Sequence, residues 1–235
     1  MNKDRFEIGQ TACTAHFGDA PEFLLIQPAD DYDLAGLDRE TEALAAETGD
    51  TFLLAAFKVG SWNRDLSPWK APAVFGPENF GDGAEATLGF ITEQLLPAVI
   101  SRYSLPEQIP VILGGYSLAG FFSLWSAYQT DAFRAAAAVS PSVWFPGWIG
   151  YAGAHQPRAG SVYLSLGNKE PKTKNRVMSA VGDCIRRQQE LLSETGIPNV
   201  LEWNEGNHFK DPDLRCARGF AWCIRAASRQ LAIGS

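Results

Sequence analysis

The sequence predicts an α/β fold, with a mostly parallel central sheet that carries helices on both faces. Short apolar runs alternate along the chain with longer segments whose apolar residues recur at helical spacing. Strands that alternate with helices pair in parallel, because the chain crosses back over the sheet between them. Hydrophobic residues make up 46% of the 235 residues and charged residues 20%, the balance of a globular protein. A chain of this length can fold around one hydrophobic core, so we expect residues 1–235 to form a single domain.

Each predicted strand is an apolar run bounded by glycine, proline or polar residues. The first is irregular, and the second is expected to close at Pro28, since proline lacks the N–H that a strand ladder needs. The predicted strands span residues 6–17, 22–27, 51–57, 111–115, 135–139, 161–166 and 199–203.

The predicted helices place their apolar residues on one face. The first carries Leu34, Leu37 and Leu44 on that face and is followed by Gly49, a typical stop signal. The second contains Pro97, which predicts a kink. The predicted helices span residues 33–47, 83–103, 118–128, 174–194 and 211–231, and two long loops, 59–83 and 140–160, should form the walls of a cleft.

Charge and composition exclude several classes of protein. A net charge of −7 argues against nucleic acid or an anionic membrane as a partner. No apolar run is long enough to span a bilayer, and the N-terminus lacks a signal-peptide core, so we expect a cytoplasmic protein. The four cysteines have no metal-ligand spacing. HExxH, P-loop and dinucleotide motifs are also absent, so no cofactor and no metal is expected.

The charge is unevenly distributed. Residues 19–50 hold ten acids and one base, whereas residues 158–187 hold seven bases and two acids. Two solvated faces would account for this pattern. The alternative is a basic rim at the active site that favours an anionic substrate, to which Lys58, Arg64, Lys169 and Lys172 could contribute.

Residues 111–120, Val-Ile-Leu-Gly-Gly-Tyr-Ser-Leu-Ala-Gly, carry the strongest chemical signal. An apolar strand ends at Ser117 and passes directly into a helical pattern, which is typical of a nucleophile elbow. The usual motif is G-x-S-x-G; here Ala119 holds the fifth position and Gly120 follows. Small flanking residues allow strand and helix to approach, and so sharp a bend should force the serine into a strained backbone conformation.

A serine hydroxyl needs a base that takes its proton and an acid that orients the base. Active sites in parallel sheets lie at the carboxyl ends of the strands. Glu170 follows the predicted strand 161–166, and His208 follows strand 199–203. The order serine, acid, histidine is that of α/β-hydrolase triads. The sequence therefore predicts Ser117, Glu170 and His208 as catalytic residues.

The alternatives remain open at this point. His16 and His155 are the other histidines, and Asp211 or Asp213 could orient His208 or cap the last helix. A serine–histidine pair without an acid is a further possibility. So is a structural turn with a solvated serine at residue 117.

An oxyanion hole needs two backbone N–H groups aimed at the developing charge. The residue after the nucleophile, Leu118, should supply one of them. We expect the other from the loop after strand 51–57, at Lys58 or Val59.

From about Phe52 to its C-terminus the chain resembles the α/β-hydrolase esterases that include esterase D and the enterochelin and trilactone esterases. The resemblance implies a serine carboxylic-ester hydrolase without a cofactor, although some members of this group act with a Ser–His pair and no clear acid. Where the group's serine motif usually ends Gly-Gly, this chain has Ala119-Gly120. The motifs that carry the resemblance are Trp62–Pro68 before Phe75-Gly76, Glu93–Pro97 with Tyr103, Gly115–Gly120, Ser140–Trp144, Gly167–Glu170 and Gly206–His208.

Aromatic residues should shape the substrate site. Tyr116 precedes the serine, and the aromatic residues in loops at the expected active-site end are Trp62, Trp69, Trp144, Trp148 and Phe209. If they line the mouth, the substrate carries a flat apolar group. No insertion is large enough for a lid domain, which argues against a long-chain lipase.

We therefore expect a carboxylesterase that cleaves a small to medium ester through an acyl-enzyme intermediate. Acyl transfer, thioester hydrolysis or peptide hydrolysis on the same triad are alternatives, as is a binding protein on a hydrolase scaffold. The expected partner is a small-molecule ester, and the sequence leaves the oligomeric state open.

Overall fold

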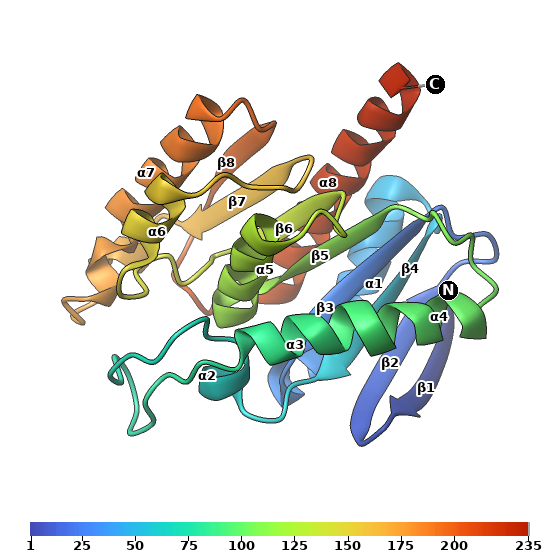
Figure 1. Ribbon diagram of the computed structural model, residues 1–235, viewed down its shortest axis with the longest axis horizontal. Coiled ribbons are helices and arrows are strands. Elements are labelled where there is room, and N and C mark those ends of the chain that lie inside the picture. Colours follow the sequence, from blue (N-terminus) through green and yellow to red (C-terminus); the bar gives the residue numbers. More distant parts are fainter. Residues whose placement is uncertain (235) are drawn as a thin grey trace.

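A computed structural model describes residues 1–234 and contains one eight-stranded sheet (Figure 1). The strand order is β1-β2-β4-β3-β5-β6-β7-β8. β1 and β2 are antiparallel, β2 and β4 are antiparallel, and every further neighbouring pair from β4 to β8 is parallel. The mostly parallel sheet that the sequence predicts is thus confirmed. The strands are β1 (Asn2–Ile8), β2 (Thr11–Phe17), β3 (Phe23–Ala29), β4 (Phe52–Lys58), β5 (Val111–Tyr116), β6 (Ala135–Val139), β7 (Val162–Gly167) and β8 (Asn199–Asn204).

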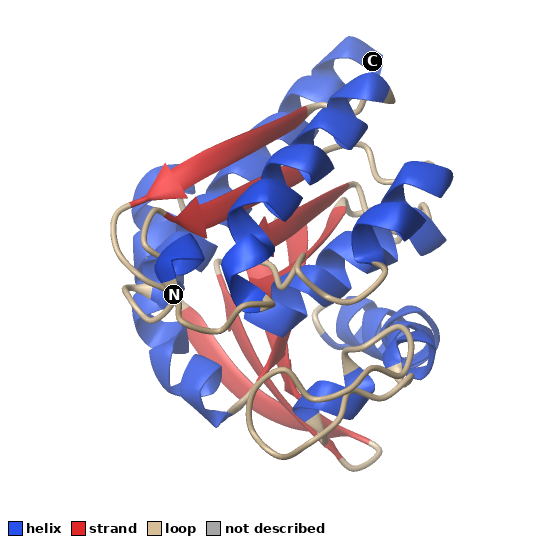
Figure 2. Ribbon diagram, turned by 90° about the vertical axis from the view of Figure 1, so that its left-hand side faces the viewer, coloured by secondary structure: helices blue, strands red, loops and turns tan. Residues whose placement is uncertain are grey.

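Helices cover both faces of the sheet, so the strands run between two helical layers (Figure 2). α1 and α8 pack together on one face, and α3 to α7 pack on the other (Figure 1). The helices are α1 (Asp31–Thr48), α2 (Trp62–Asp65), α3 (Ala84–Phe90), α4 (Leu96–Arg102), α5 (Ser117–Gln129), α6 (Trp148–Ala154), α7 (Val181–Glu194) and α8 (Pro212–Gly234).

Two of the predicted strands differ from those observed. The segment 6–17, which was predicted as one irregular strand, belongs to a hairpin of β1 and β2. Gly9 adopts a φ of 60° at the turn between them. Pro28 lies inside β3 rather than ending it. Proline is tolerated there because β5 pairs with β3 only from Leu24 to Ile26, so no partner on that side requires an N–H from Pro28.

Two of the predicted helices also differ in detail. A π-helical turn, Ile91–Leu95, separates α3 from α4 just before Pro97, so the break expected from proline is present as a widened turn. α7 begins at Val181 instead of residue 174, because the side chain of Asn175 accepts from the N–H groups of Val177 and Met178 and closes a local turn there.

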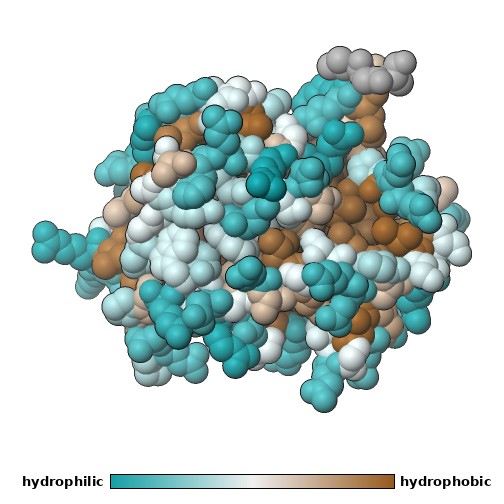
Figure 3. Space-filling view, viewed as in Figure 1, coloured by the Kyte–Doolittle hydropathy of each residue, from teal (hydrophilic) through white to brown (hydrophobic). Residues whose placement is uncertain are grey.

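The carboxyl ends of the parallel strands share one edge of the sheet, and the loops that leave this edge carry Ser117, Glu170 and His208. The face drawn in Figure 3 is largely hydrophilic, with hydrophobic residues in patches between polar ones. Within residues 1–234, no helix is long and apolar enough to cross a membrane.

Candidate active site

Ser117 lies at the bend where β5 passes into α5. Its φ is 57°, a left-handed conformation that a non-glycine residue rarely adopts, as the elbow motif predicts. The bend requires a glycine at residue 120, since a Cβ there would lie 2.7 Å from the carbonyl oxygens of both Gly115 and Val139. The close approach of α5 to β5 and β6 therefore holds the serine at the edge of the sheet.

We expect Gly120→Ala to lower the free energy of unfolding by about 1–3 kcal/mol, because the added methyl group must displace two backbone segments. Gly89→Ala, on α3, is a matched control: a Cβ there has no atom within 4 Å, and alanine favours a helix by up to about 1 kcal/mol over glycine. Urea unfolding of both variants measures the difference. Equal stability of the two would contradict the crowding at the elbow.

The structure brings Ser117, His208 and Glu170 together in one chain of hydrogen bonds. His208 Nε2 lies 2.9 Å from Ser117 Oγ, and its Nδ1 lies 2.7 Å from Glu170 Oε2. With the proton on Nδ1, the imidazole donates to Glu170 and accepts from the serine hydroxyl, the arrangement that proton removal from serine requires. Residues from three separate loops thus meet at hydrogen-bonding distance.

The second oxygen of Glu170 is held by other donors. Its Oε1 accepts from the N–H of Gly167 at 2.7 Å and from the hydroxyl of Ser140 at 2.9 Å. Arg215 Nη1 lies 3.3 Å from the same oxygen. One oxygen is therefore anchored and the other faces His208, which fixes the carboxylate relative to the imidazole. No sequence motif marks Arg215, because it is one of several arginines in the amphipathic helix α8.

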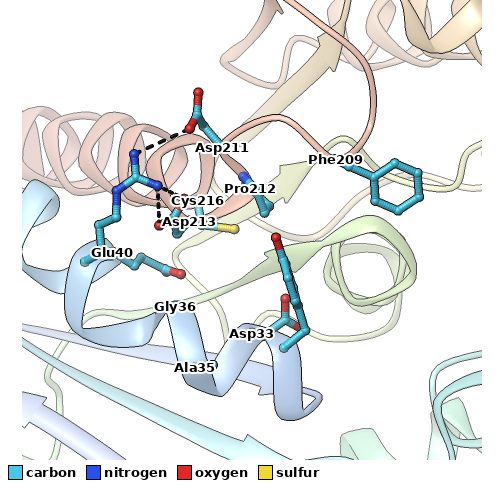
Figure 4. Close-up of a pocket in the computed structure, with 11 residues that line it drawn as sticks. Asp33, Ala35, Gly36, Glu40, Phe209, Asp211, Pro212, Asp213 and Cys216 are labelled. Atoms are coloured by element: carbon cyan, nitrogen blue, oxygen red, sulfur yellow. Dashed lines mark hydrogen bonds and ion pairs between the residues drawn. The ribbon is translucent and has the colours of Figure 1, made fainter.

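Asp211 and Asp213 do not approach the imidazole as partners. Arg39 forms an ion pair of 3.4 Å with Asp211 and one of 3.0 Å with Asp213, beside a neighbouring cavity (Figure 4). Asp33 lines that cavity. Burial of its carboxyl group and, to a smaller extent, the negative charge of Asp30 raise the pKa of Asp33 to about 7. The two aspartates considered as alternatives to Glu170 thus belong to a separate acidic cluster.

The other two histidines lie away from the serine. His16 is buried in β2, with Nε2 2.7 Å from Asp38 Oδ1. His155 is exposed, and its Nδ1 lies 2.8 Å from the carbonyl oxygen of Tyr151. Neither contacts Ser117 or Glu170.

The expected second oxyanion donor requires a correction. β3, not β4, lies beside β5, so the loop that begins at Lys58 is one strand further from Ser117. The N–H of Val59 donates to the carbonyl oxygen of Ala29 at 3.0 Å, and both Lys58 and Val59 line a different cavity. Leu118 keeps its predicted place, directly after the serine at the start of α5.

A cavity of about 540 Å³ opens above Ser117. Of the predicted aromatic residues, Trp69 and Trp148 lie outside this cavity, and Trp62, Trp144 and Phe209 line it. Tyr116 does not: it is buried beneath the triad, and its hydroxyl donates to the carbonyl oxygen of His208 at 2.7 Å. Burial, and then the charge of Glu170, raises the pKa of Tyr116, so its hydroxyl keeps the proton that it donates. Further apolar residues that line the cavity, none of them among the predicted substrate-binding residues, are Phe75, Pro141, Met178 and Val181.

Two of the four predicted cationic residues, Lys169 and Lys172, line this cavity. Lys58 and Arg64 do not; they pair with Asp31 at 2.6 Å and with Asp65 at 2.7 Å. In the described part of the chain, no group of three or more His, Cys, Asp or Glu side chains has the spacing of a metal site.

Comparison with known proteins identifies a family and a fold. The model of the family Esterase, described as putative esterase, matches residues 33–204. No curated protein sequence matches the chain significantly. Among solved structures, an IroE-like serine hydrolase from Shewanella oneidensis has a TM-score of 0.74 at 14% identity, with 94% of this chain and 79% of that chain covered.

Two further structures show the same fold at low identity. The siderophore hydrolase EstB from Aspergillus nidulans has a TM-score of 0.70 at 19% identity, covering 94% of each chain. Enterobactin hydrolase IroE in complex with DFP has a TM-score of 0.65 at 14% identity, covering 96% of this chain and 94% of that chain.

Proposed function

The chain belongs to the family Esterase, and we propose that it is a serine carboxylesterase that acts through an acyl-enzyme intermediate. Ser117 is the nucleophile, His208 the general base and acid, and Glu170 the residue that orients His208. The single observation that carries this proposal is the unbroken hydrogen-bond chain from Ser117 Oγ through the imidazole to Glu170 Oε2.

The reaction follows from that chain of hydrogen bonds. Ser117 Oγ attacks the ester carbonyl carbon while His208 Nε2 takes its proton, and the carbonyl oxygen becomes an oxyanion. The N–H of Leu118 stabilises this charge, since it lies at the N-terminus of α5. His208 then protonates the leaving alcohol. A water molecule attacks the acyl-enzyme by the same route and releases the carboxylic acid.

The second oxyanion donor belongs in the segment that follows β3, at residues 30–32. β3 pairs directly with β5, so the chain leaves it on the serine side of the sheet edge. Within this segment the N–H of Asp30 donates to Asp33 Oδ2 at 3.2 Å, which leaves Asp31 and Tyr32 as the stronger candidates.

We also infer the substrate class from the cavity. Aromatic walls formed by Trp62, Trp144 and Phe209 favour a flat apolar group next to the ester carbonyl. Lys169 and Lys172 supply positive charge at the same cavity, and the single acid there, Glu170, is occupied by His208 and Arg215. An aromatic ester that also carries an anionic group fits this combination.

Burst kinetics with p-nitrophenyl acetate test the acyl-enzyme directly. Stoichiometric release of p-nitrophenol before a slower steady state is the expected result, because acylation precedes water attack. A linear release from the first turnover, with hydroxylamine unable to intercept an acyl group, would contradict the acyl-enzyme step.

The double variant Lys169→Gln/Lys172→Gln should raise KM about tenfold for an aromatic ester with a carboxylate. Each of the two lysine charges contributes up to about 1 kcal/mol to binding of the substrate carboxylate at an open site. KM for the neutral methyl-capped analogue should stay unchanged. Lys70→Gln is the control, since Lys70 lies outside the cavity and pairs with Asp82. An equal effect on both substrates would reject the anionic preference.

A further inference from the structure

Arg215 is among the largest fully buried side chains of the described residues, at 1% exposure. A guanidinium is always charged, so it is found at such depth only where its charge and its donors are matched. It lies on the first turn of α8, beneath the loops that carry Glu170 and His208. The triad alone therefore does not explain why an arginine is buried at this position.

One arm of the guanidinium faces the acid. Nη1 lies 3.3 Å from Glu170 Oε1, 3.0 Å from the hydroxyl of Tyr116 and 3.4 Å from Ser140 Oγ. Since Tyr116 is the last residue of β5 and Ser140 directly follows the neighbouring strand β6, this arm links the acid to the rigid edge of the sheet.

The other arm faces the turn that carries the histidine. Nη2 donates to the carbonyl oxygens of Glu205 and Asn207, each at 3.1 Å. Asn207 directly precedes His208, whose own carbonyl oxygen accepts from Tyr116. One planar group thus spans the carboxylate on one side and the histidine turn on the other.

Atoms of Glu170, Arg215 and the histidine turn are closely packed around Gly167. A Cβ on Gly167 would lie 2.6 Å from the carbonyl oxygen of Gly206, 2.9 Å from Glu170 Oε1 and 3.1 Å from Arg215 Nη1. The chain therefore has a glycine where the acid, the arginine and the histidine turn converge.

We propose that Arg215 is a positioning residue, which sets the Glu170–His208 geometry through its two arms and balances the buried charge of Glu170. It touches neither Ser117 nor the cavity above it, so it acts through the other two members of the triad. The inference rests on the proposed function, because it has meaning only where Ser117 and His208 are the reacting pair.

Kinetics of Arg215→Met and Arg215→Lys separate positioning from substrate binding. We expect kcat to fall about 100-fold in Arg215→Met, the cost of a displacement of about 1 Å at a catalytic group, with KM changed less than about threefold. Arg215→Lys should lose about tenfold, since an ammonium keeps the charge but lacks the fork that reaches both sides. Arg225→Met is the control, because Arg225 lies further along α8 and pairs with Glu47.

A double-mutant cycle with Glu170→Gln provides the readout that a purely structural role would not give. If Arg215 sets the Glu170–His208 geometry, adding Arg215→Met to Glu170→Gln costs clearly less than the roughly 100-fold that it costs in the wild type, so the two losses do not multiply. The cycle is run with Arg215→Lys if Arg215→Met does not fold. Multiplying losses, or a wild-type kcat in folded Arg215→Lys, would overturn the inference.

The proposed function is checked in the same series. A wild-type protein that a fluorophosphonate does not label at Ser117 would defeat the proposed function itself. Full labelling of wild type together with wild-type turnover in both Arg215 variants would defeat only the role of Arg215.

Discussion

Ser117→Ala is expected to lower kcat/KM for an aryl ester by at least about 10,000-fold, the cost of losing the nucleophile of a triad. No other hydroxyl is hydrogen-bonded to His208 Nε2 among the described contacts, so no neighbour can replace it. His208→Ala should cost a similar factor. The double variant should be no worse than either, since the two residues act as one unit.

A serine on the same helix is the control for this result. Ser126 is buried on α5, and its Oγ has no hydrogen-bond partner among the residues that the structure describes. Ser126→Ala therefore removes a hydroxyl from the same helix without changing the triad. Steady-state hydrolysis and thermal unfolding are measured for both variants. Retention of more than about 1% of the activity in folded Ser117→Ala would place the nucleophile elsewhere.

Glu170→Gln is expected to lower kcat by about 1,000–10,000-fold with little change in KM. A neutral amide can present its N–H₂ to His208 Nδ1, which then favours the tautomer that cannot accept the serine proton at Nε2. The amide also leaves the positive charge of Arg215 unbalanced in a buried site.

Asp211→Asn is the matched comparison for the acid, because Asp211 follows the histidine in sequence but pairs with Arg39. It should keep turnover within a few fold of wild type. Equal, small losses in both variants would show that the enzyme works with a Ser–His pair alone.

Local patterns in the sequence predicted most of the fold. The elbow at Ser117, the helix that ends at Gly49 and the parallel strands all follow from spacing and from residues with strong local preferences. The hairpin at Gly9 was missed because β1 is largely polar and carries no apolar run. The late start of α7 was missed because the side-chain turn at Asn175 competes with a helix.

Features that depend on the order of strands could not be predicted in the same way. The sequence places strand 51–57 after strand 22–27, but only the fold shows that β3 lies between β4 and β5. The loop at Lys58 and Val59, where the second oxyanion donor was expected, therefore lies one strand away from β5. Tyr116 was placed wrongly at the substrate site, and Arg215 was missed. Their contacts join residues about a hundred positions apart, which no local pattern in the sequence indicates.

The chemistry of the site was predictable from the sequence to the extent that it follows chain order. Ser117 directly follows β5, and Glu170 and His208 lie in the segments that leave β7 and β8, so a common sheet edge brings the three near one another. A single domain over residues 1–235 and a cytoplasmic location stay predictions.

Labelling with a fluorophosphonate probe, located by peptide mass spectrometry, tests the central claim most directly. The probe should form one adduct per chain, on Ser117, and the rate of labelling should fall about 1,000-fold in His208→Ala, because the imidazole no longer takes the serine proton. An adduct on another residue, or an equal labelling rate in folded His208→Ala, would contradict the account.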